Sequence, residues 1–289
     1  MEKTGWPVTA FALRRNEAVV GGLIGMERTA GRTVDLEMIP LAPYAGPSRR
    51  NFHGDQSDGL AFWAEELPNR YSRVQLDLFP GWNDIRPFIH RGWSVEPRFT
   101  YINPLNADAE REISPSVLRR ARRAARAGVV FDDGIAPEEF VALWAMTLQR
   151  RVVSEYVNRS ALSEILSALT ASGDCEILGT RLPDGSLVAA NAILYDQTSA
   201  YFWLSGFDSD EPHRGASNQL CHVETLRRAA GRATQFDWLG ANTPGIAEYK
   251  KTFGGELVPY YRVRWKRPAS NIKTWTGWIR DCPLFRRSP

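Results

Sequence analysis

The order of hydrophobic patterns after residue 137 restricts the possible folds of this chain more than any other feature. Two stretches with helical periodicity come first, three runs of strand type follow, and helix and strand then alternate. Helices interleaved with strands in this way predict a mixed α/β (α+β) domain in which helices cover a sheet. In order, the segments read APEEFVALWAMTLQRR, NRSALSEILSALTASG, CEILGTRL, SLVAANAILYD, SAYFWLSGFD, GASNQLCHVETLRRAAGR, QFDWLGA, PGIAEYKKTFGG and VPYYRVRWK.

The first hundred residues are patterned mainly as strands and loops. The apolar runs predict a hairpin over 18–28 and 33–44, strands over 71–80 and 93–105, and short helices over 58–67 and 84–92.

No low-complexity linker separates this region from the rest, so we expect two units that share a substantial interface. We place the first at residues 1–108 and the second at 109–267. A tail, 268–289, carries Trp275 and Trp278 and is expected to pack back on the body.

The composition is that of a globular protein. The 289 residues are 43% hydrophobic and 24% charged, so the chain can bury a core without disulfides. No apolar run reaches membrane-spanning length, and MEKTGWPVTAF lacks the apolar segment of a signal peptide. Three cysteines, far apart and odd in number, favour a reducing compartment. We expect a cytoplasmic protein and a monomer.

The sequence offers neither a metal site nor an obvious nucleophile. The four histidines are scattered, with no H-x-x-x-H or H-E-x-x-H spacing, so no metal is expected. There is no G-x-S-x-G motif, and Cys175 and Cys221 lie in apolar segments with no obvious base. A reaction without a covalent enzyme intermediate fits this best.

Residues 114–128, SPSVLRRARRAARAG, predict a strongly basic helix that begins at Ser114-Pro115 and ends at Gly128. One face is mostly alanine. The opposite face has no acidic residue at helical spacing, so it is either a solvated basic surface or a phosphate-binding stripe. This stripe, called the arginine stripe below, consists of Arg119, Arg122, Arg123 and Arg126.

The stretch FDWLGANTPGIAEYKKTFGGELVPYYRVRW, residues 236–265, resembles the closing signature of Fem-like proteins, a branch of the GNAT acyltransferase superfamily. Further motifs resemble that family in order along the chain. The resemblance implies tandem GNAT-like units around a shared cleft, the first of them degenerate and shortened. These motifs are YAGP (44–47), DIRPF (84–88), RFTYI (98–102), LRRARRAARAGV (118–129) and GSLVAANAILYDQTSAYFWLSGFDSD (185–210).

Two features depart from the family pattern. The first unit starts close to its central hairpin, so the usual opening strand and helices are expected to be missing or reduced. The long helical arm of some Fem proteins is absent from the sequence. The chain therefore resembles the shorter members of the family.

The resemblance implies a reaction that needs no cofactor. Fem-like enzymes move an amino acid from aminoacyl-tRNA to an amine and form an amide bond. The acceptor is then a cell-wall precursor or a small peptide or nucleoside natural product. Because the aminoacyl ester is already activated, the enzyme must align the reactants and stabilise the oxyanion.

An acyl-CoA donor on the same scaffold is the alternative, and a binder of RNA or anionic polymer without activity is a third possibility. CoA-dependent GNAT enzymes carry a glycine-rich turn before the helix that takes the pyrophosphate. Here that place reads DEPHRGASNQL, with Arg214-Gly215-Ala216 at unusual spacing beside Asp210 and Glu211. This disfavours CoA. A simple binder would have no need of the YKKTFGG segment.

The resemblance also implies site residues. Lys250 matches the family lysine and is expected to be catalytic, with its ammonium on the oxyanion or the terminal ribose and phosphate. Tyr249 matches the aromatic partner and would stack on a terminal adenine. The arginine stripe would bind tRNA phosphates or the diphosphate of a nucleotide-linked acceptor. The strand pattern itself adds further substrate-binding candidates. Tyr201, Trp203 and Ser205 alternate on one predicted face of a central strand, and Asn191 lies mid-strand on its neighbour. Because a buried polar group needs a partner, we expect Asn191 and Ser205 to line the cleft.

Overall fold

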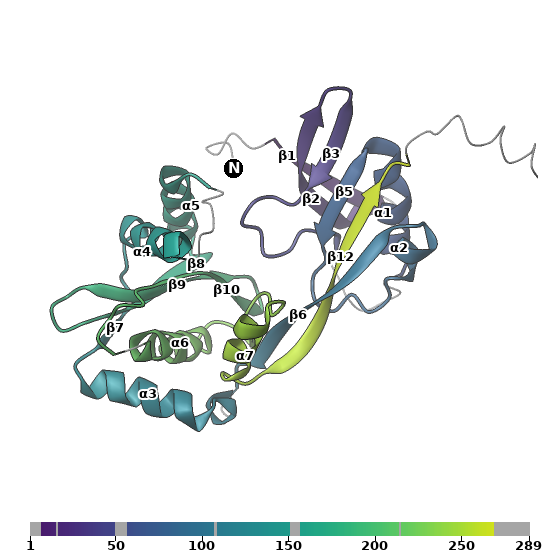
Figure 1. The fold of residues 1–289 in the computed structure, drawn as a ribbon. Helices are drawn as coiled ribbons and strands as arrows, with labels where there is room; N and C mark the ends of the chain where they lie inside the picture. Colours follow the sequence, from purple (N-terminus) through teal and green to yellow (C-terminus); the bar gives the residue numbers. More distant parts are fainter. Residues whose placement is uncertain are drawn as a thin grey trace, which may run out of the picture.

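One twisted β-sheet runs through both units of the protein (Figure 1). The computed structural model describes residues 7–15, 17–49, 57–106, 109–150, 157–213 and 215–268. Its twelve strands follow the order β1-β2-β3-β5-β12-β6-β11-β10-β9-β8-β7, with β4 paired to β2. The predicted tail beyond 268 and Arg214 lie outside the described residues.

Within the described residues, the elements of the first unit are four strands followed by two helices that alternate with two more strands. They are β1 (Val8–Arg15), β2 (Ala18–Ala30), β3 (Thr33–Glu37), β4 (Ser48–Arg49), α1 (Ser57–Arg70), β5 (Arg73–Asp77), α2 (Arg86–His90) and β6 (Ser94–Pro104).

From residue 137 the second unit has the predicted order of helices and strands, and the mixed α/β fold class is confirmed; strand β7, before that point, is not predicted by the sequence pattern. Its elements are the 3₁₀ turn η2 (Ala109–Glu112), α3 (Pro115–Arg126), β7 (Val130–Asp132), α4 (Pro137–Arg150), α5 (Arg159–Ala171), β8 (Cys175–Arg181), β9 (Leu187–Tyr195), β10 (Ser199–Phe207), α6 (Ala216–Ala229), β11 (Gln235–Asp237), α7 (Pro244–Lys251) and β12 (Glu256–Lys266).

The first unit begins with a strand that the sequence pattern does not predict. Strand β1 pairs with β2 in antiparallel register, from Val8 opposite Met26 to Arg15 opposite Ala18. Its sequence, VTAFALRR, alternates only partly, so its strand character depends on this pairing and not on periodicity.

The last strand ties the two units together. Strand β12 lies between β5 and β6 in the sheet, although it closes the sequence of the second unit. It pairs with β6 from Glu256 opposite Ile102 to Arg264 opposite Ser94. The boundary between residues 108 and 109 stays a prediction, because one continuous hydrogen-bonded sheet contains strands of both units.

Three apolar clusters fill the layers on the two faces of the sheet. Trp63, Leu67 and Phe88 join α1 and α2 to the sheet of the first unit. In the second unit α3, α6 and α7 cover one face, and α4 and α5 cover the other (Figure 1). None of the helices within the described ranges is long and apolar enough to cross a membrane.

Gly206 tests how closely β10 packs on α4. A Cβ atom there would lie 2.7 Å from the backbone nitrogen and 2.9 Å from the Cα of Trp144. Backbone cannot give way as a flexible side chain does, so we expect Gly206→Ala to lower the free energy of unfolding by about 1–3 kcal/mol. Urea titration followed by circular dichroism measures this change.

Gly59→Ala is the matched control for this substitution. Gly59 lies in α1, and a Cβ atom added to it would have no other atom within 4 Å, so alanine should leave stability unchanged or raise it. Equal effects of the two substitutions would contradict close packing at Gly206.

Candidate active site

The two central strands of the second unit separate at a fork. Parallel strands β10 and β11 pair over only three positions, from Ser199 opposite Gln235 to Tyr201 opposite Asp237. Strand β10 continues to Phe207, whereas the backbone turns away from it after β11 ends at Asp237. Leu239 and Gly240 both have positive φ angles, 49° and 63°, in that turn. A left-handed non-glycine residue is strained and needs support from its surroundings.

Asp237 fixes the start of this turn from inside the protein. Its carboxylate is only 2% exposed and accepts hydrogen bonds from Tyr44 Oη at 2.7 Å, Thr100 Oγ1 at 2.5 Å and the Leu239 amide at 2.8 Å. Burial raises the pKa of this carboxyl, while the hydrogen bonds from Thr100 and Tyr44 oppose the rise. Because Tyr44 comes from the β3–β4 loop, the carboxylate connects the first unit to the fork.

Lys250 supports the same turn from its other side. The ammonium donates to the carbonyl oxygens of Trp238 at 2.6 Å, of Leu239, and of Gly240 at 2.9 Å. These three acceptors match the three N–H donors of a lysine ammonium. The side chain is 9% exposed. Lys250 therefore lies at the fork with its charge directed at the turn, and its predicted catalytic role stays a prediction.

Tyr249 lies in an aromatic and polar cluster between α6 and α7. Its hydroxyl accepts from Asn218 Nδ2 at 3.1 Å and lies 3.3 Å from His222 Nδ1. His222 is buried against Phe202 and other rings, and its Nδ1 lies 2.6 Å from the carbonyl oxygen of Asn218. Burial lowers the pKa of His222 to about 4, so this imidazole is neutral near pH 7.

A β-bulge rearranges the predicted face of β10. The register passes from Phe202 opposite Ile193 to Leu204 opposite Ala192, so Trp203 stands opposite no residue. Phe202 packs on the α6 side of the sheet and Leu204 on the α4 side. A pure alternation would have placed these two residues on one side.

The bulge corrects the expectation that Tyr201, Trp203 and Ser205 share a face. Tyr201 lies edge-on to Tyr44, with ring centroids 6.5 Å apart, and Trp203 Nε1 donates to the Leu41 carbonyl at 2.6 Å. Both therefore face the first unit. Ser205 is directly opposite Asn191, and directly paired side chains point to the same side of a sheet. Ser205 therefore shares a side with Asn191 and not with Tyr201 and Trp203.

Asn191 also departs from its expected place at the cleft. It is fully buried, and its Nδ2 donates to Thr225 Oγ1 at 3.0 Å and to Cys221 Sγ at 3.2 Å on α6. A substrate cannot reach this side chain, so Asn191 connects the sheet to α6. The sequence pattern could not show which neighbours accept from the amide nitrogen.

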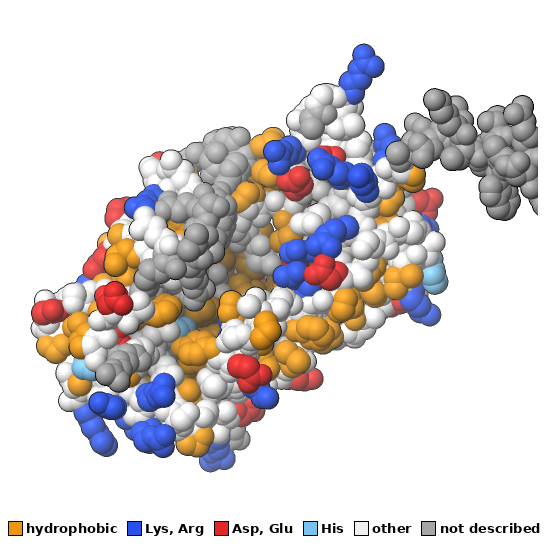
Figure 2. Space-filling model, viewed as in Figure 1, with side chains coloured by type: hydrophobic (Ala, Val, Ile, Leu, Met, Phe, Trp, Pro, Cys, Tyr) orange, Lys and Arg blue, Asp and Glu red, His pale blue; other side chains and the backbone are white. Residues whose placement is uncertain are grey.

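The wall opposite β10 comes from β6 of the first unit and from β12, which pairs with it. By register, Tyr260 and Arg262 of β12 share a face with Arg98 and Glu96 of β6. The Tyr260 hydroxyl accepts from Arg98 Nε at 3.3 Å, and Arg262 pairs with the buried carboxylate of Asp77 at 2.7 Å. Figure 2 shows a hollow between this part of the molecule and the lobe of α4 and α5, with hydrophobic side chains inside it.

The arginine stripe lies apart from this hollow. Helix α3 packs Val117, Ala121 and Ala124 against the rest of the second unit, so its basic face points outward. All four arginines of the stripe are exposed, and none pairs with an acid in the described part of the chain. Basic side chains gather over α3 at the lower left of Figure 2. Burial of the alanine face is as predicted, and phosphate binding stays a prediction.

Sequence reasoning missed several residues that build the site. Asp237 carried a signal, because a carboxylate inside an otherwise apolar strand needs partners. His222 carried a weaker one, since Asn218, His222 and Thr225 recur at helical spacing on the buried face of α6. Tyr44 carried a signal only as the first residue of the YAGP motif, which does not indicate that the fold brings its loop to the fork.

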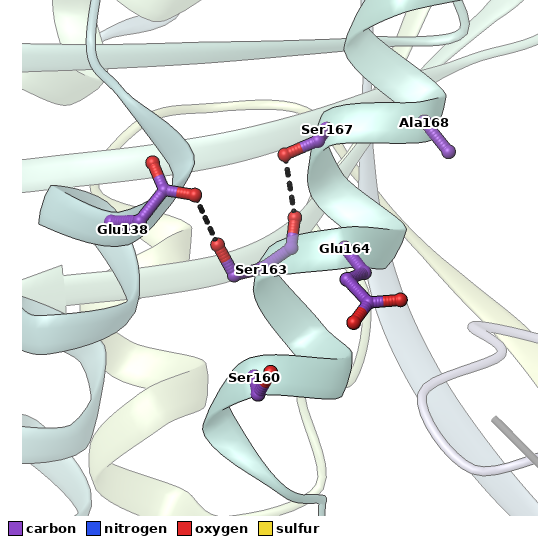
Figure 3. A pocket seen from close by; sticks show the side chains of 6 residues that line it. All are labelled: Glu138, Ser160, Ser163, Glu164, Ser167 and Ala168. Carbon is purple, nitrogen blue, oxygen red and sulfur yellow. Dashed lines mark hydrogen bonds between the residues drawn. The ribbon is translucent and has the colours of Figure 1, made fainter. Parts of the chain in front are cut away.

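Another hollow lies between α4 and α5, on the far side of the sheet from α7, with a volume of about 510 Å³. Figure 3 shows Ser163 Oγ donating to Glu138 at 2.7 Å and Ser167 Oγ donating to the Ser163 carbonyl at 2.8 Å. None of the lining residues comes from the fork.

Part of the chain matches a model of a known protein family. Residues 115–251 match the family model described as "Acetyltransferase (GNAT) domain", which spans α3 to α7. The match includes the fork, the β10 bulge, Tyr249 and Lys250.

Solved structures with the same fold cover nearly the whole chain. FemX superposes with a TM-score of 0.68 at 14% identity, over 90% of this chain and 89% of that one. The C-terminal domain of a putative lysylphosphatidylglycerol synthetase from Agrobacterium fabrum gives 0.60 at 14% identity, over 89% and 83%. A tandem GNAT protein from the clavulanic acid biosynthesis pathway gives 0.52 at 12% identity, over 92% and 85%.

One curated relative covers a shorter stretch. A Corynebacterium efficiens protein named isocitrate lyase is 25% identical over 176 residues, which is 60% of this chain. The chain spans only 36% of that relative's length, so its named activity does not transfer. By contrast, the family match and the solved structures agree with each other and with the sequence motifs. We conclude that residues 115–251 form a GNAT-type domain and that the chain shares its fold with FemX.

Proposed function

We propose that this protein is an aminoacyltransferase that moves an amino acid from aminoacyl-tRNA to an acceptor amine. The observation that carries this proposal is the placement of Tyr249 and Lys250. The segment that resembles the Fem-like signature folds around the fork, within a chain that superposes on FemX over 90% of its length. The acceptor belongs to a cell-wall precursor or to a small peptide or nucleoside.

The reaction needs alignment and charge stabilisation only. The amine nitrogen attacks the ester carbonyl, a C–N bond forms, and the C–O bond to the terminal ribose breaks. The proton leaves the amine and ends on the ribose oxygen, so no external reagent is consumed. The backbone amide at the bulge residue Trp203, which stands opposite no residue in the register, is our candidate donor to the oxyanion.

The donor and the acceptor would approach from different parts of the molecule. The exposed arginine stripe suits the extended phosphate backbone of a tRNA, because guanidinium groups grip phosphate with paired hydrogen bonds. Its distance from the hollow argues against the diphosphate of a small acceptor. We place the acceptor in the hollow beside Tyr201 and Trp203.

An acyl-CoA donor is the second candidate. The specific observation in its favour is the family match, since the matching domain is described as an acetyltransferase. The acyl group, the fork and the oxyanion donor would be the same, and only the activating group would differ.

The donor decides between the two candidates and can be tested directly. We expect transfer of a radiolabelled amino acid from charged tRNA to an amine acceptor, and no transfer from acetyl-CoA. Incubation with each labelled donor and a panel of peptide and nucleoside amines measures both. Acetyl transfer without tRNA-dependent transfer would establish the CoA candidate, and binding of tRNA without any transfer would indicate a simple binder.

The arginine stripe should contribute to tRNA affinity and to the dependence of that affinity on salt concentration. Replacing Arg122 and Arg126 by glutamine should weaken binding and reduce the slope of log K against log salt by about one unit per lost contact. Filter binding at several salt concentrations measures the slope. Folding should be nearly unchanged, since both side chains are exposed. An unchanged slope would mean that the arginine stripe does not contact tRNA phosphates and is only a solvated basic surface.

Lys250→Met separates two roles for the lysine. If the ammonium also acts on the oxyanion, kcat should fall by roughly 10²–10³. Since three carbonyls accept from it here, we expect stability to fall as well, by about 1–3 kcal/mol. Paired kinetic and urea measurements on the same preparation distinguish these results.

Lys251→Met is the control, because Lys251 is exposed one position further along α7. It should change neither quantity appreciably. If both lysine variants behave alike, the catalytic role that the family motif implies for Lys250 is wrong.

A further inference from the structure

The amino end of α6 already contains an anion supplied by the chain itself. The Glu211 carboxylate accepts from the His213 amide at 2.7 Å, the Gly215 amide at 2.6 Å and Ser217 Oγ at 3.1 Å. Glu211 is only 5% exposed, although it lies in a surface turn. Backbone amides and the positive end of a helix form the kind of seat that binds phosphate in other proteins.

This seat adjoins the candidate site. Asn218 lies in the first turn of α6, one residue after Ser217, and its side-chain amide donates to the hydroxyl of Tyr249. A donor that carries a diphosphate and lies along α6 would therefore place its phosphates where Glu211 is. Gly215, with φ of 81°, lets the turn bring its amide close to the carboxylate.

We propose that Glu211 is a specificity residue that keeps diphosphate-bearing donors such as CoA from the amino end of α6. A phosphate would have to displace a buried carboxylate and leave it without its three donors, which is costly for a charged group. The proposal rests on the proposed function, because it explains how an acyltransferase of this fold selects a donor that does not use this seat.

Calorimetric titration of the full chain with CoA, and separately with inorganic pyrophosphate, tests the proposal. We expect no measurable binding to the wild type. Glu211→Ala empties the seat and should raise the affinity by at least about tenfold. Glu211→Gln leaves a neutral occupant that a phosphate can displace, and should give a smaller gain. Asp210→Asn removes the same charge from the exposed neighbour and should stay close to wild type.

Two results would overturn the proposal. The wild type could bind CoA as tightly as Glu211→Ala does, or all three variants could gain equally, which would indicate charge repulsion without a seat. Circular dichroism checks folding, and if Glu211→Ala does not fold, Glu211→Gln against Asp210→Asn decides. Transfer from aminoacyl-tRNA by the wild type is scored separately. A protein without that activity whose Glu211 variants gain CoA binding would refute the proposed function and leave this inference standing.

Discussion

The buried carboxylate of Asp237 is the interaction on which the rest of the structure depends. It receives hydrogen bonds from a loop of the first unit, from β6 and from the turn after β11. A charge taken out of water requires such donors, so all three segments must come together whenever the second unit folds. Loss of any one partner would leave the carboxylate short of hydrogen bonds. The connection between the units therefore follows from satisfying one carboxylate.

The turn that Asp237 begins is stabilised from both sides. Its amide at Leu239 points to the carboxylate, and its carbonyls at residues 238–240 point to the ammonium of Lys250. Two opposite charges thus hold two consecutive left-handed residues in place. Such a turn directs the chain after β11 away from β10 and leaves the fork open on a rigid frame, which is what positioning of two reactants requires.

Charge is distributed unevenly around this frame. The arginine stripe presents unpaired cations on the outer surface of α3, within the described part of the chain, whereas the amino end of α6, next to the fork, is filled by Glu211. Under the proposed function these two features act together on the donor. The stripe favours a long polyanion over a broad surface, and the carboxylate disfavours a compact diphosphate close to the chemistry.

The sequence by itself determined most of the helices and strands, though not β1 or β7, because periodicity records which side of an element is buried, as in α3 with its alanine and arginine faces. It also indicated the GNAT-type domain, since the motif around Tyr249 and Lys250 is local. Only the tertiary structure decided that β12 lies between β5 and β6, that the bulge at Trp203 turns Ser205 away from Tyr201, and that Asn191 is buried under α6. It also decided that Tyr44 reaches Asp237 across 193 positions of the chain. Periodicity describes one element at a time, whereas pairing, bulges and buried hydrogen bonds depend on partners that are distant in the sequence.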